Sequence, residues 1–339
     1  MKDISSIKNL VHYPVMLDQV LKICSPHNGG LFVDCTFGGG GYSNAILSFP
    51  NTKVIAIDRD INTKVYADNL KNNFKNRFTF HNLKFSEISK VLYKNKKKAD
   101  CIIFDLGLSS FQISNLKRGF SFKSKNKLDM CMGLNSTTAL DVINNFSLKT
   151  LSDILRVFGE EKEFYYIAKN IINQRKDKPI TTVTDLTKII KKSKRRDLGK
   201  KINISTKSFQ AIRIFVNKEI SELIYGLVEA TKLLKSGGKI IVVSFHSLED
   251  KIVKFFFTNF SSNKPITSRY YPDIQNNKKD LFKSYTNKII TPTSKEIEKN
   301  NPSRSAKLRF VVRSKYDFVY PEDLKKKFAK YLELESRHV

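Results

Sequence analysis

The chain has 339 residues, which is enough for a full hydrophobic core and for two domains. It carries 61 Lys and Arg against 32 Asp and Glu, a formal net charge of +29. This excess favours a polyanionic partner, most simply nucleic acid, although a composition rich in Lys, Asn and Ile also supplies basic residues that only solvate the surface. No apolar signal region opens the chain and no apolar run reaches ~18 residues, so we expect a soluble cytoplasmic protein without membrane contact.

Strands and helices alternate up to about residue 112. The predicted strands are 31–34, 54–57, 78–81 and 101–105, with helices such as 61–74 and 86–93 between them. Such alternation predicts parallel strands joined by right-handed crossovers.

The alternation stops from residue 114 to about 208, where we predict helices and loops, including helices 140–154 and 164–174. It resumes with a helix over 217–234, a glycine pair and an apolar strand over 239–244, then a helix over 247–260. Two closing strands, 286–290 and 307–313, and a terminal helix from Pro321 complete the chain. We therefore predict a sheet domain in two parts, 1–112 and 214–316, interrupted by an inserted helical substrate-recognition domain over 113–213 and followed by a C-terminal helix over 317–339.

A run of four glycines, residues 38–41, follows the first predicted strand and leads into a helix near Tyr42. Glycine lets the backbone approach a ligand closely, and a strand, loop and helix in this order hold nucleoside cofactors. Asp58 ends the second strand, 24 residues after Asp34, where an acid can bond a ribose diol. The G-x-G-x-x-G fingerprint fits Gly38 and Gly40 but meets Ser43 at its sixth position. The loop alone leaves a nicotinamide dinucleotide and S-adenosylmethionine both open.

Two further polar groups follow predicted strands at the same edge of the sheet. Asp105 ends the fourth strand and precedes Ser109, so it can meet both cofactor and substrate, or else cap the next segment. His246 follows the strand over 239–244, where an imidazole can act as a general acid or base, or can simply satisfy loop carbonyls. Ser247 and Asp250 have nearly the spacing of a helix capping box.

The segment 169–218 has 15 basic and 3 acidic residues. It includes Lys191, Lys192, Lys194, Arg195 and Arg196. Such a run is usually a solvated surface, but inside an insertion beside a cofactor site we favour capture of a nucleic-acid backbone. The four cysteines have no metal-binding spacing, so we expect free thiols and no metal.

Longer strings occur in order along residues 12–313. They are HYPVML (12–17), D-x-T-F-G-x-G-G (34–41), AIDRD (56–60), DLG-x-SS-x-Q (105–112), RGFSF (118–122), LDM (128–130), FQA-x-RI (209–214), N-x-E (217–219), SFHSLED (244–250) and SAKLR (305–309). This set resembles the RsmH (MraW) family of bacterial small-subunit ribosomal RNA methyltransferases. The resemblance implies a class I S-adenosylmethionine-dependent α/β fold, Rossmann-like, with a seven-stranded, mostly parallel sheet and an inserted helical domain.

The resemblance also implies the reaction. It is N4-methylation of a cytidine in the decoding region of 16S ribosomal RNA, with S-adenosylhomocysteine as the second product. The partner is small-subunit ribosomal RNA or the assembled small subunit, and no stable protein partner is implied.

By the resemblance, the cofactor-binding residues are Gly38, Gly40, Gly41, Tyr42, Asp58, Phe85, Asp105 and Gln112. The family usually has His where this chain has Tyr42 and Arg where it has Cys131. We assign the catalytic work to Asp105 with Ser109, and then to His246. We assign RNA contacts to the five basic residues 191, 192 and 194–196 together with Arg118, Phe120, Phe122, Arg213 and Asn217. Phe120 and Phe122 are candidates to stack an unstacked base, although a pair spaced i, i+2 is more often core.

Two rival functions use the same features. An NAD-dependent oxidoreductase would be stabilised by NADH in a thermal melt, whereas a methyltransferase would be stabilised by S-adenosylmethionine or S-adenosylhomocysteine. A non-catalytic RNA-binding assembly factor would keep the cofactor pocket without methylating RNA.

Overall fold

The computed structural model describes residues 14–93, 98–194, 203–262, 280–283, 285 and 288–337. Its contacts divide the chain into two compact units. Unit 1 comprises Met1–Gly107 and Leu223–Lys327, and unit 2 comprises Leu108–Glu222 and Phe328–Val339. Each unit is described by itself below.

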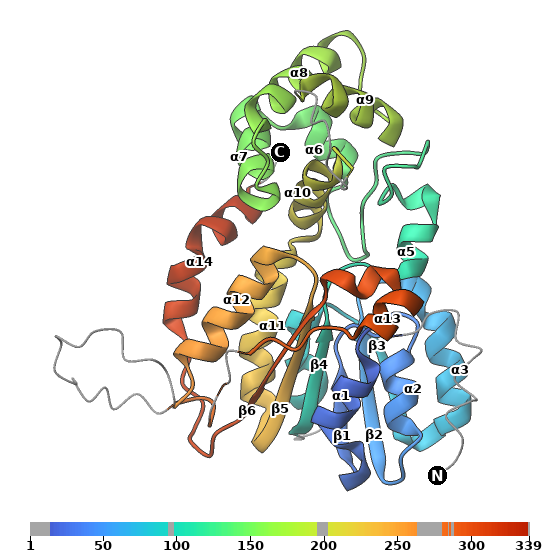
Figure 1. Cartoon of the computed structure of the whole chain (residues 1–339), viewed down its shortest axis with the longest axis vertical. Helices are drawn as coiled ribbons and strands as arrows, with labels where there is room; N and C mark the ends of the chain where they lie inside the picture. The colour runs from blue at the N-terminus through green and yellow to red at the C-terminus, as the bar shows by residue number, and fades with distance from the viewer. Residues whose placement is uncertain are drawn as a thin grey trace, which may run out of the picture. The chain divides into compact units, whose positions relative to one another are not determined.

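Unit 1 is built on one sheet of six described strands (Figure 1). They are β1 (Gly30–Asp34), β2 (Thr52–Asp58), β3 (Phe78–Asn82), β4 (Ala99–Asp105), β5 (Leu234–Ser244) and β6 (Lys307–Val312). The spatial order is β3-β2-β1-β4-β5-β6, with every pair parallel except β5 and β6. The order reverses between β1 and β4, and ligands bind at such a switch point, outside the carboxyl ends of the strands. The predicted α/β class with a mostly parallel sheet is confirmed.

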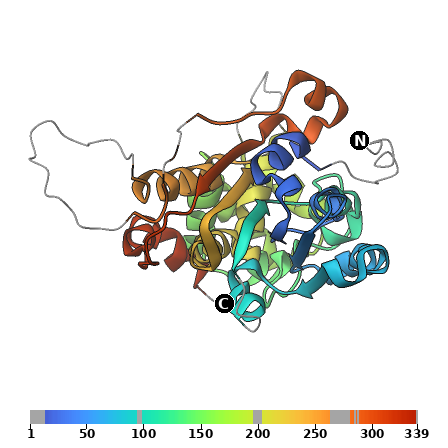
Figure 2. The same ribbon diagram turned by 90° about the horizontal axis from the view of Figure 1, so that it is seen from below.

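Helices lie on both sides of this sheet (Figure 2). One face packs against α1 (Leu17–Cys24), α2 (Gly41–Leu47) and α3 (Lys64–Phe74), which share a buried apolar core with Phe32, Val54 and Cys101. On the other face, Phe104 of β4 lies against Phe85 and beside Gly226 of α11 (Glu219–Leu233). Both faces are covered because apolar residues occupy consecutive positions along β4, as in buried parallel strands.

The remaining elements of unit 1 are short or peripheral. The α-helices are α4 (Ser89–Leu92), α12 (Ser247–Asn259), α13 (Ser294–Lys299) and the first part of α14 (Glu322–Glu335). The 3₁₀ turns are η2 (Pro26–Asn28), η3 (Ile61–Thr63), η4 (Lys75–Arg77), η5 (Phe85–Glu87) and η8 (Asn301–Ser305). Among the residues that the structure describes, no helix is both long enough and apolar enough to cross a membrane.

Unit 2 is helical in its described part. It contains α5 (Ser110–Ser114), η7 (Leu116–Arg118), α6 (Ala139–Asn145), α7 (Leu148–Gly159), α8 (Phe164–Asp177), α9 (Val183–Ser193) and α10 (Thr206–Asn217). One helix expected over 140–154 is divided into α6 and α7, because Ser147 accepts a hydrogen bond from the Thr150 N–H (3.2 Å) and starts a new helix.

Two expectations about strands differ from the structure. Of the expected strand over 286–290, residues 286 and 287 lie outside the described residues, and the described part forms an isolated bridge between Ile290 and Leu308. The described sheet has six strands, where seven were expected. The glycine pair expected before the fifth strand lies inside β5, where Gly237 has φ +80° and the register with β4 shifts. A side chain is disfavoured at that φ, so the glycine permits an irregularity within the strand and does not end it.

Candidate cofactor site and RNA-binding residues

The glycine loop of unit 1 is tied to the end of β2. The Gly38 N–H donates to Asp58 Oδ2 (2.8 Å), and the Asp60 N–H donates to Asp58 Oδ1 (2.8 Å). Gly38 and Gly40 have φ of +53° and +79°, and a Cβ added to Gly40 would lie 2.8 Å from the Phe37 ring. Glycine is therefore required here both for the backbone conformation and for the close approach.

Asp58 lies where a ribose-binding acid was predicted. Burial raises the pKa of its carboxyl to about 7, and the charges of Asp60 and Asp34 add to this, while the two backbone N–H donors act in the opposite direction. A carboxylate has about four acceptor positions, so two remain for ligand hydroxyls.

Asp34 is a further element of the loop that the sequence analysis treated only as the end of a strand. Its carboxylate accepts from Ser43 Oγ (2.7 Å) and from the Thr36 N–H (3.3 Å), and burial raises its pKa to about 6. Ser43, the residue that departs from the dinucleotide fingerprint, lies in α2 and thus ties the loop to this helix through its bond to Asp34. A hydroxyl nine residues after a strand-ending acid was the signal available in the sequence.

Tyr42, which stands where the family usually has His, directs its side chain into the core. Its ring is buried, and its hydroxyl donates to the Val15 carbonyl. Only the backbone of Tyr42 is therefore left to face a ligand, next to Gly41, where an added Cβ would lie 2.8 Å from Pro14.

Phe85 is half-buried on the opposite face of the sheet from the glycine-loop helix. Its ring meets Phe104 edge to face at 5.4 Å between centroids, and a Cβ on Gly226 would come within 2.6 Å of it. The close packing on Gly226 holds the Phe85 ring at one place just beyond β3.

Asp105, at the end of β4, has a carboxylate oxygen without a protein partner. Its N–H donates to Thr36 Oγ1 (2.7 Å), whereas Oδ1 is buried and has no hydrogen-bond partner among the described residues. Burial, together with the charges of Asp34 and Glu249, raises the pKa of this carboxyl well above its usual range. A buried unpaired acceptor is costly, so this oxygen fits a ligand that brings a donor.

The alternative that Asp105 caps the next helix is wrong. Ser109 is the N-cap of α5: its N–H donates to Gln112 Oε1 (3.0 Å) and its hydroxyl accepts from the Gln112 N–H (3.4 Å). Both side chains, predicted for catalysis and cofactor binding respectively, thus form a capping box within unit 2.

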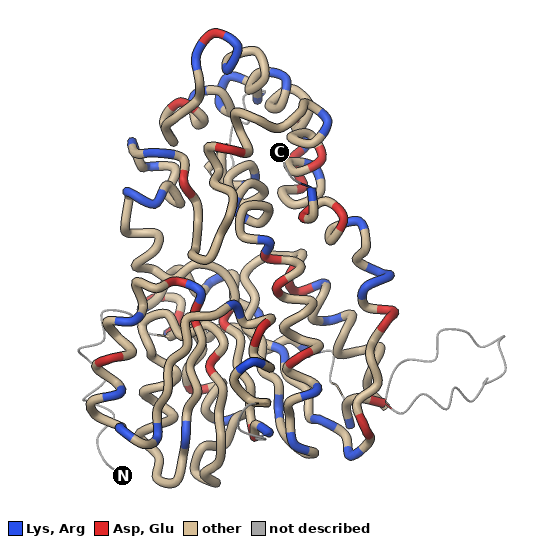
Figure 3. The backbone as a smooth tube through the Cα atoms, turned by 180° about the vertical axis from the view of Figure 1, so that it is seen from behind, with Lys and Arg blue, Asp and Glu red and all other residues tan. Residues whose placement is uncertain are grey.

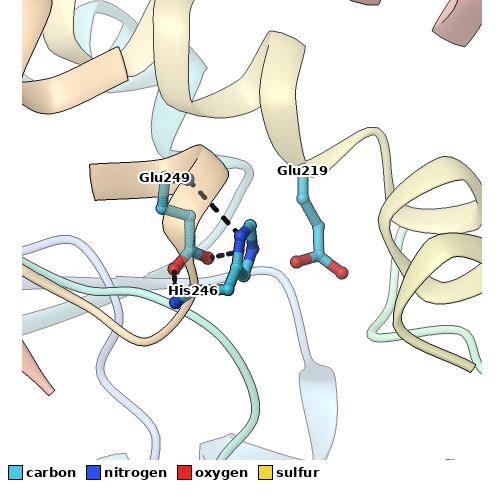
Figure 4. A group of neighbouring side chains, drawn as sticks. All are labelled: Glu219, His246 and Glu249. Atoms are coloured by element: carbon cyan, nitrogen blue, oxygen red, sulfur yellow. Dashed lines mark hydrogen bonds and ion pairs between the residues drawn. The ribbon is translucent and has the colours of Figure 1, made fainter. Parts of the chain in front are cut away.

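His246 caps α12 through Glu249 (Figure 4). Its Nδ1 accepts from the Glu249 N–H (3.4 Å), and its Nε2 lies 3.0 Å from Glu249 Oε1 but outside hydrogen-bond geometry. The capping box expected at Ser247 and Asp250 is therefore wrong by one residue. Asp250 instead binds Arg309 of β6, with its Oδ1 2.6 Å from Nε. Histidine is an uncommon N-cap, which is why the sequence pattern favoured the serine.

The predicted RNA contacts of the RGFSF string have partners within unit 2. Arg118 donates to the Cys131 carbonyl (2.6 Å) and its guanidinium lies 5.4 Å from the Phe120 ring centroid. Phe120 is buried, and Phe122 meets Phe209 edge to face at 6.4 Å. The aromatic pair thus has the packing role that was its alternative, and Arg118 orders the loop at Cys131.

Two other predicted RNA residues also hold unit 2 together. Asn217 is fully buried, donates to the Met130 carbonyl (2.8 Å) and accepts from the Met132 N–H (2.8 Å). Arg213 forms a two-pronged ion pair with Glu219 (both N···O distances 2.8 Å). These motif residues therefore act as internal braces.

The basic run divides into three parts. Lys191 and Lys192 are exposed in the last turn of α9. Lys194 was expected to be an exposed RNA contact, but its ammonium lies 2.5 Å from a Glu161 carboxylate oxygen and its side chain is only 8% exposed. Arg195 and Arg196 lie outside the described residues.

Comparison with known proteins places the chain in a family. The model of the MraW methylase family matches residues 9–314. A protein of Ehrlichia canis named "Ribosomal RNA small subunit methyltransferase H" is 43% identical over 305 residues, covering 89% of this chain and 100% of the relative. Proteins of the same name from Rickettsia canadensis and Rhodospirillum rubrum are 42% and 39% identical over 302 and 310 residues. They cover 88% and 90% of this chain, and 96% and 95% of their own lengths.

The match covers the glycine loop, Asp58, Asp105 and His246 alike. It confirms the predicted family and, with the sheet order, the class I methyltransferase fold and S-adenosylmethionine as cofactor. The free acceptor positions of Asp58 fit the hydroxyl groups of that cofactor's ribose. The chain belongs to the MraW methylase family.

Proposed function

We propose that this protein transfers a methyl group from S-adenosylmethionine to N4 of a cytidine in the decoding region of small-subunit ribosomal RNA. Family membership, with relatives named for small-subunit ribosomal RNA methylation, supports methylation of that RNA. The cytidine N4 target is the finer part of the proposal. The observation that carries it is the buried, unpaired Oδ1 of Asp105 at the carboxyl end of β4.

An exocyclic cytosine amine is a weak nucleophile because its lone pair is conjugated with the ring. When the nitrogen bonds to a methyl group, it must lose a proton, and an acceptor within hydrogen-bond reach favours that loss. Asp105 Oδ1 is such an acceptor when the carboxyl is ionised, and a raised pKa makes this carboxylate a stronger base than an ordinary aspartate. S-adenosylmethionine supplies the electrophilic methyl and leaves as S-adenosylhomocysteine.

Other residues of unit 1 position the groups of this site. Thr36 fixes the backbone of Asp105, and Asp58 shapes the glycine loop that would carry the nucleoside. In this proposal Gly38, Gly40, Gly41, Tyr42 and Phe85 line the cofactor through backbone and ring surface. His246, held by Glu249, is a positioning residue for the loop after β5.

The test is the modification map of small-subunit ribosomal RNA from a deletion strain. We expect N4-methylcytidine to disappear from the decoding region and to return when the wild-type gene is restored, but not when the Asp105→Asn gene is restored. Unchanged N4-methylcytidine in the deletion strain would refute the enzyme and favour the non-catalytic assembly factor. Stabilisation by NADH but not by S-adenosylhomocysteine would favour the oxidoreductase.

A further inference from the structure

Three aromatic residues, Phe164, Tyr165 and Tyr166, open α8, and among the described residues only the first has a ring contact with a side chain outside this group. The Phe164 ring lies 5.5 Å below the guanidinium of Arg156, which also pairs with Asp153 (2.8 Å). Tyr165 and Tyr166 are 46% and 61% exposed, with their ring centroids 6.0 Å apart and the ring planes at 77°. Two neighbouring aromatic faces are thus presented to solvent from a rigid helix.

The exposed side of α8 continues the tyrosines with basic and amide residues. Lys169, Asn173 and Lys176 follow Tyr165 at spacings of four, eight and eleven, which places them on one helical face, and all are exposed. The buried residues Ile167, Ala168 and Ile171 occupy the other face. The helix therefore has one side that packs in unit 2 and one side that combines aromatic rings with positive charge.

The end of α9 brings more positive charge to the same part of unit 2. Asn170 Nδ2, one turn after Tyr166, donates to Ser193 Oγ (2.9 Å). The exposed Lys191 and Lys192 immediately precede Ser193, so their stems start within a turn of this hydrogen bond. Figure 3 shows the blue positions along α8 and α9.

We propose that Tyr165 and Tyr166 form a stacking platform for an unpaired base of the RNA substrate, with Lys169, Lys191 and Lys192 binding the adjoining phosphates. The proposal rests on the proposed RNA substrate. Single-stranded nucleic acid binds where aromatic faces, which accept any base, stand beside cations that follow the backbone. Helix α8 and the last turn of α9 supply both components within one unit.

The test compares binding of a single-stranded RNA fragment with binding of the same sequence as a duplex, across a series of salt concentrations. Removing both rings by Tyr165→Ala and Tyr166→Ala should weaken single-strand binding about 5- to 100-fold and leave the slope of log affinity against log salt unchanged. Duplex binding should change little, because its bases are already stacked. The Tyr→Phe double variant should bind like the wild type.

Two controls separate the parts of the surface. Tyr225→Ala removes an exposed tyrosine of unit 1 (38% exposed) and should not affect RNA binding. Lys191→Gln with Lys192→Gln should reduce the salt slope by about 0.7 for each phosphate that the variant no longer binds. Circular dichroism and a thermal melt confirm that each variant is folded.

The failures are distinguishable. The stacking platform would be overturned if the double alanine variant bound single-stranded RNA as tightly as the wild type. It would also be overturned if the double Tyr→Phe variant lost as much affinity as the alanine variant. Either result would leave the methyltransferase proposal intact. Failure of the wild-type protein to bind any single-stranded RNA would overturn the platform together with the RNA substrate. Asp105→Asn should bind RNA normally, so its loss of methylation reports on the proposed function alone.

Discussion

The carboxyl edge of the sheet in unit 1 and the motif residues of unit 2 use polar side chains in opposite ways. At the sheet edge, Asp105 keeps a buried acceptor unpaired and Asp58 keeps acceptor positions open. In unit 2, Asn217, Arg213 and Lys194 are each held by internal partners. A buried polar group without a hydrogen-bond partner is unfavourable and therefore indicates a ligand site. A buried polar group with internal partners indicates a role in stabilising the fold. The same string of motifs thus contains both a site and its supporting scaffold.

The largest test of this difference is Asp105→Asn. Replacing the acceptor by an amide keeps the shape but removes the proton acceptor, so we expect single-turnover methylation to fall by about 10²- to 10⁴-fold. Cofactor binding and the melting temperature should change far less. Asp100→Asn, at the other end of β4 and paired with Lys235 (2.8 Å), is the matched control. A rate near that of the wild type would mean that the acceptor lies elsewhere, with His246 the next candidate.

Asp58→Ala should weaken S-adenosylmethionine binding by roughly 2–4 kcal/mol, because the ribose hydroxyls and the Gly38 N–H lose a charged acceptor. Calorimetry measures the cofactor affinity, and RNA binding should be unaffected. Asp58→Asn keeps one acceptor for the loop and should show a smaller loss, which separates ribose binding from loop collapse. Asp68→Ala, at an exposed position of α3, is the neutral comparison. Cofactor affinity that is unchanged in both Asp58 variants would contradict the ribose assignment.

Asn217→Ala probes the scaffold. The change leaves the Met132 N–H and the Met130 carbonyl without their buried partner, so we expect unfolding to become easier by roughly 2–3 kcal/mol. Denaturant titration measures this loss, and Asn173→Ala on the exposed side of α8 should have almost none. If stability is retained while RNA binding falls, Asn217 contacts RNA after all.

The smallest effect is expected at Glu335, a buried carboxyl of unit 2 with both oxygens satisfied. It accepts from the N–H groups of Ile220 (3.0 Å) and Ser221 (2.7 Å), yet burial raises its pKa to about 7 from 4.5. Between pH 4.5 and 7 the folded chain retains a proton that the unfolded chain has lost, so stability falls as the pH rises through this window.

Glu335→Gln should flatten that dependence, which we expect to be on the order of 1–3 kcal/mol in denaturant titrations at about pH 5 and about pH 8. The exposed neighbour Glu333→Gln should retain the wild-type pH profile. An unaltered profile in the Glu335 variant would show that another group titrates in this range.

The sequence predicted the sheet well because its signals are local. Apolar runs such as 101–105 and 239–244 are long enough to identify strands, and Asp34, Asp58 and Asp105 mark where strands end. The expected seventh strand is not among the described strands, since the described chain near Ile290 forms one bridge to Leu308. The glycine pair at 237–238 resembled a turn, although glycine equally permits an irregular strand.

Side-chain roles were less predictable, because sequence shows a residue type but not its partner. Lys194 has the appearance of an exposed cation until the acid thirty-three residues earlier, Glu161, is known to lie against it. Asn217 is a polar residue at the end of α10, and only the fold shows that its side chain bonds to the buried turn at Met130. The exposed tyrosines of α8 were missed for the opposite reason, since aromatic residues in a helix usually pack in the core.

The acidic groups around the glycine loop also affect the proton balance of ligand binding. The formal charge of +29 counts every carboxyl as ionised, but the pKa of Asp34 lies at about 6, that of Asp58 at about 7 and that of Asp105 well above its usual range. Near neutral pH these carboxyl groups therefore retain part of their protons, and this edge of unit 1 carries less negative charge than the count of its acidic residues suggests. A ligand that donates hydrogen bonds to these oxygens favours their ionised forms. Uptake of such a ligand should release protons to the solution, so the measured heat of binding should depend on the ionisation enthalpy of the buffer.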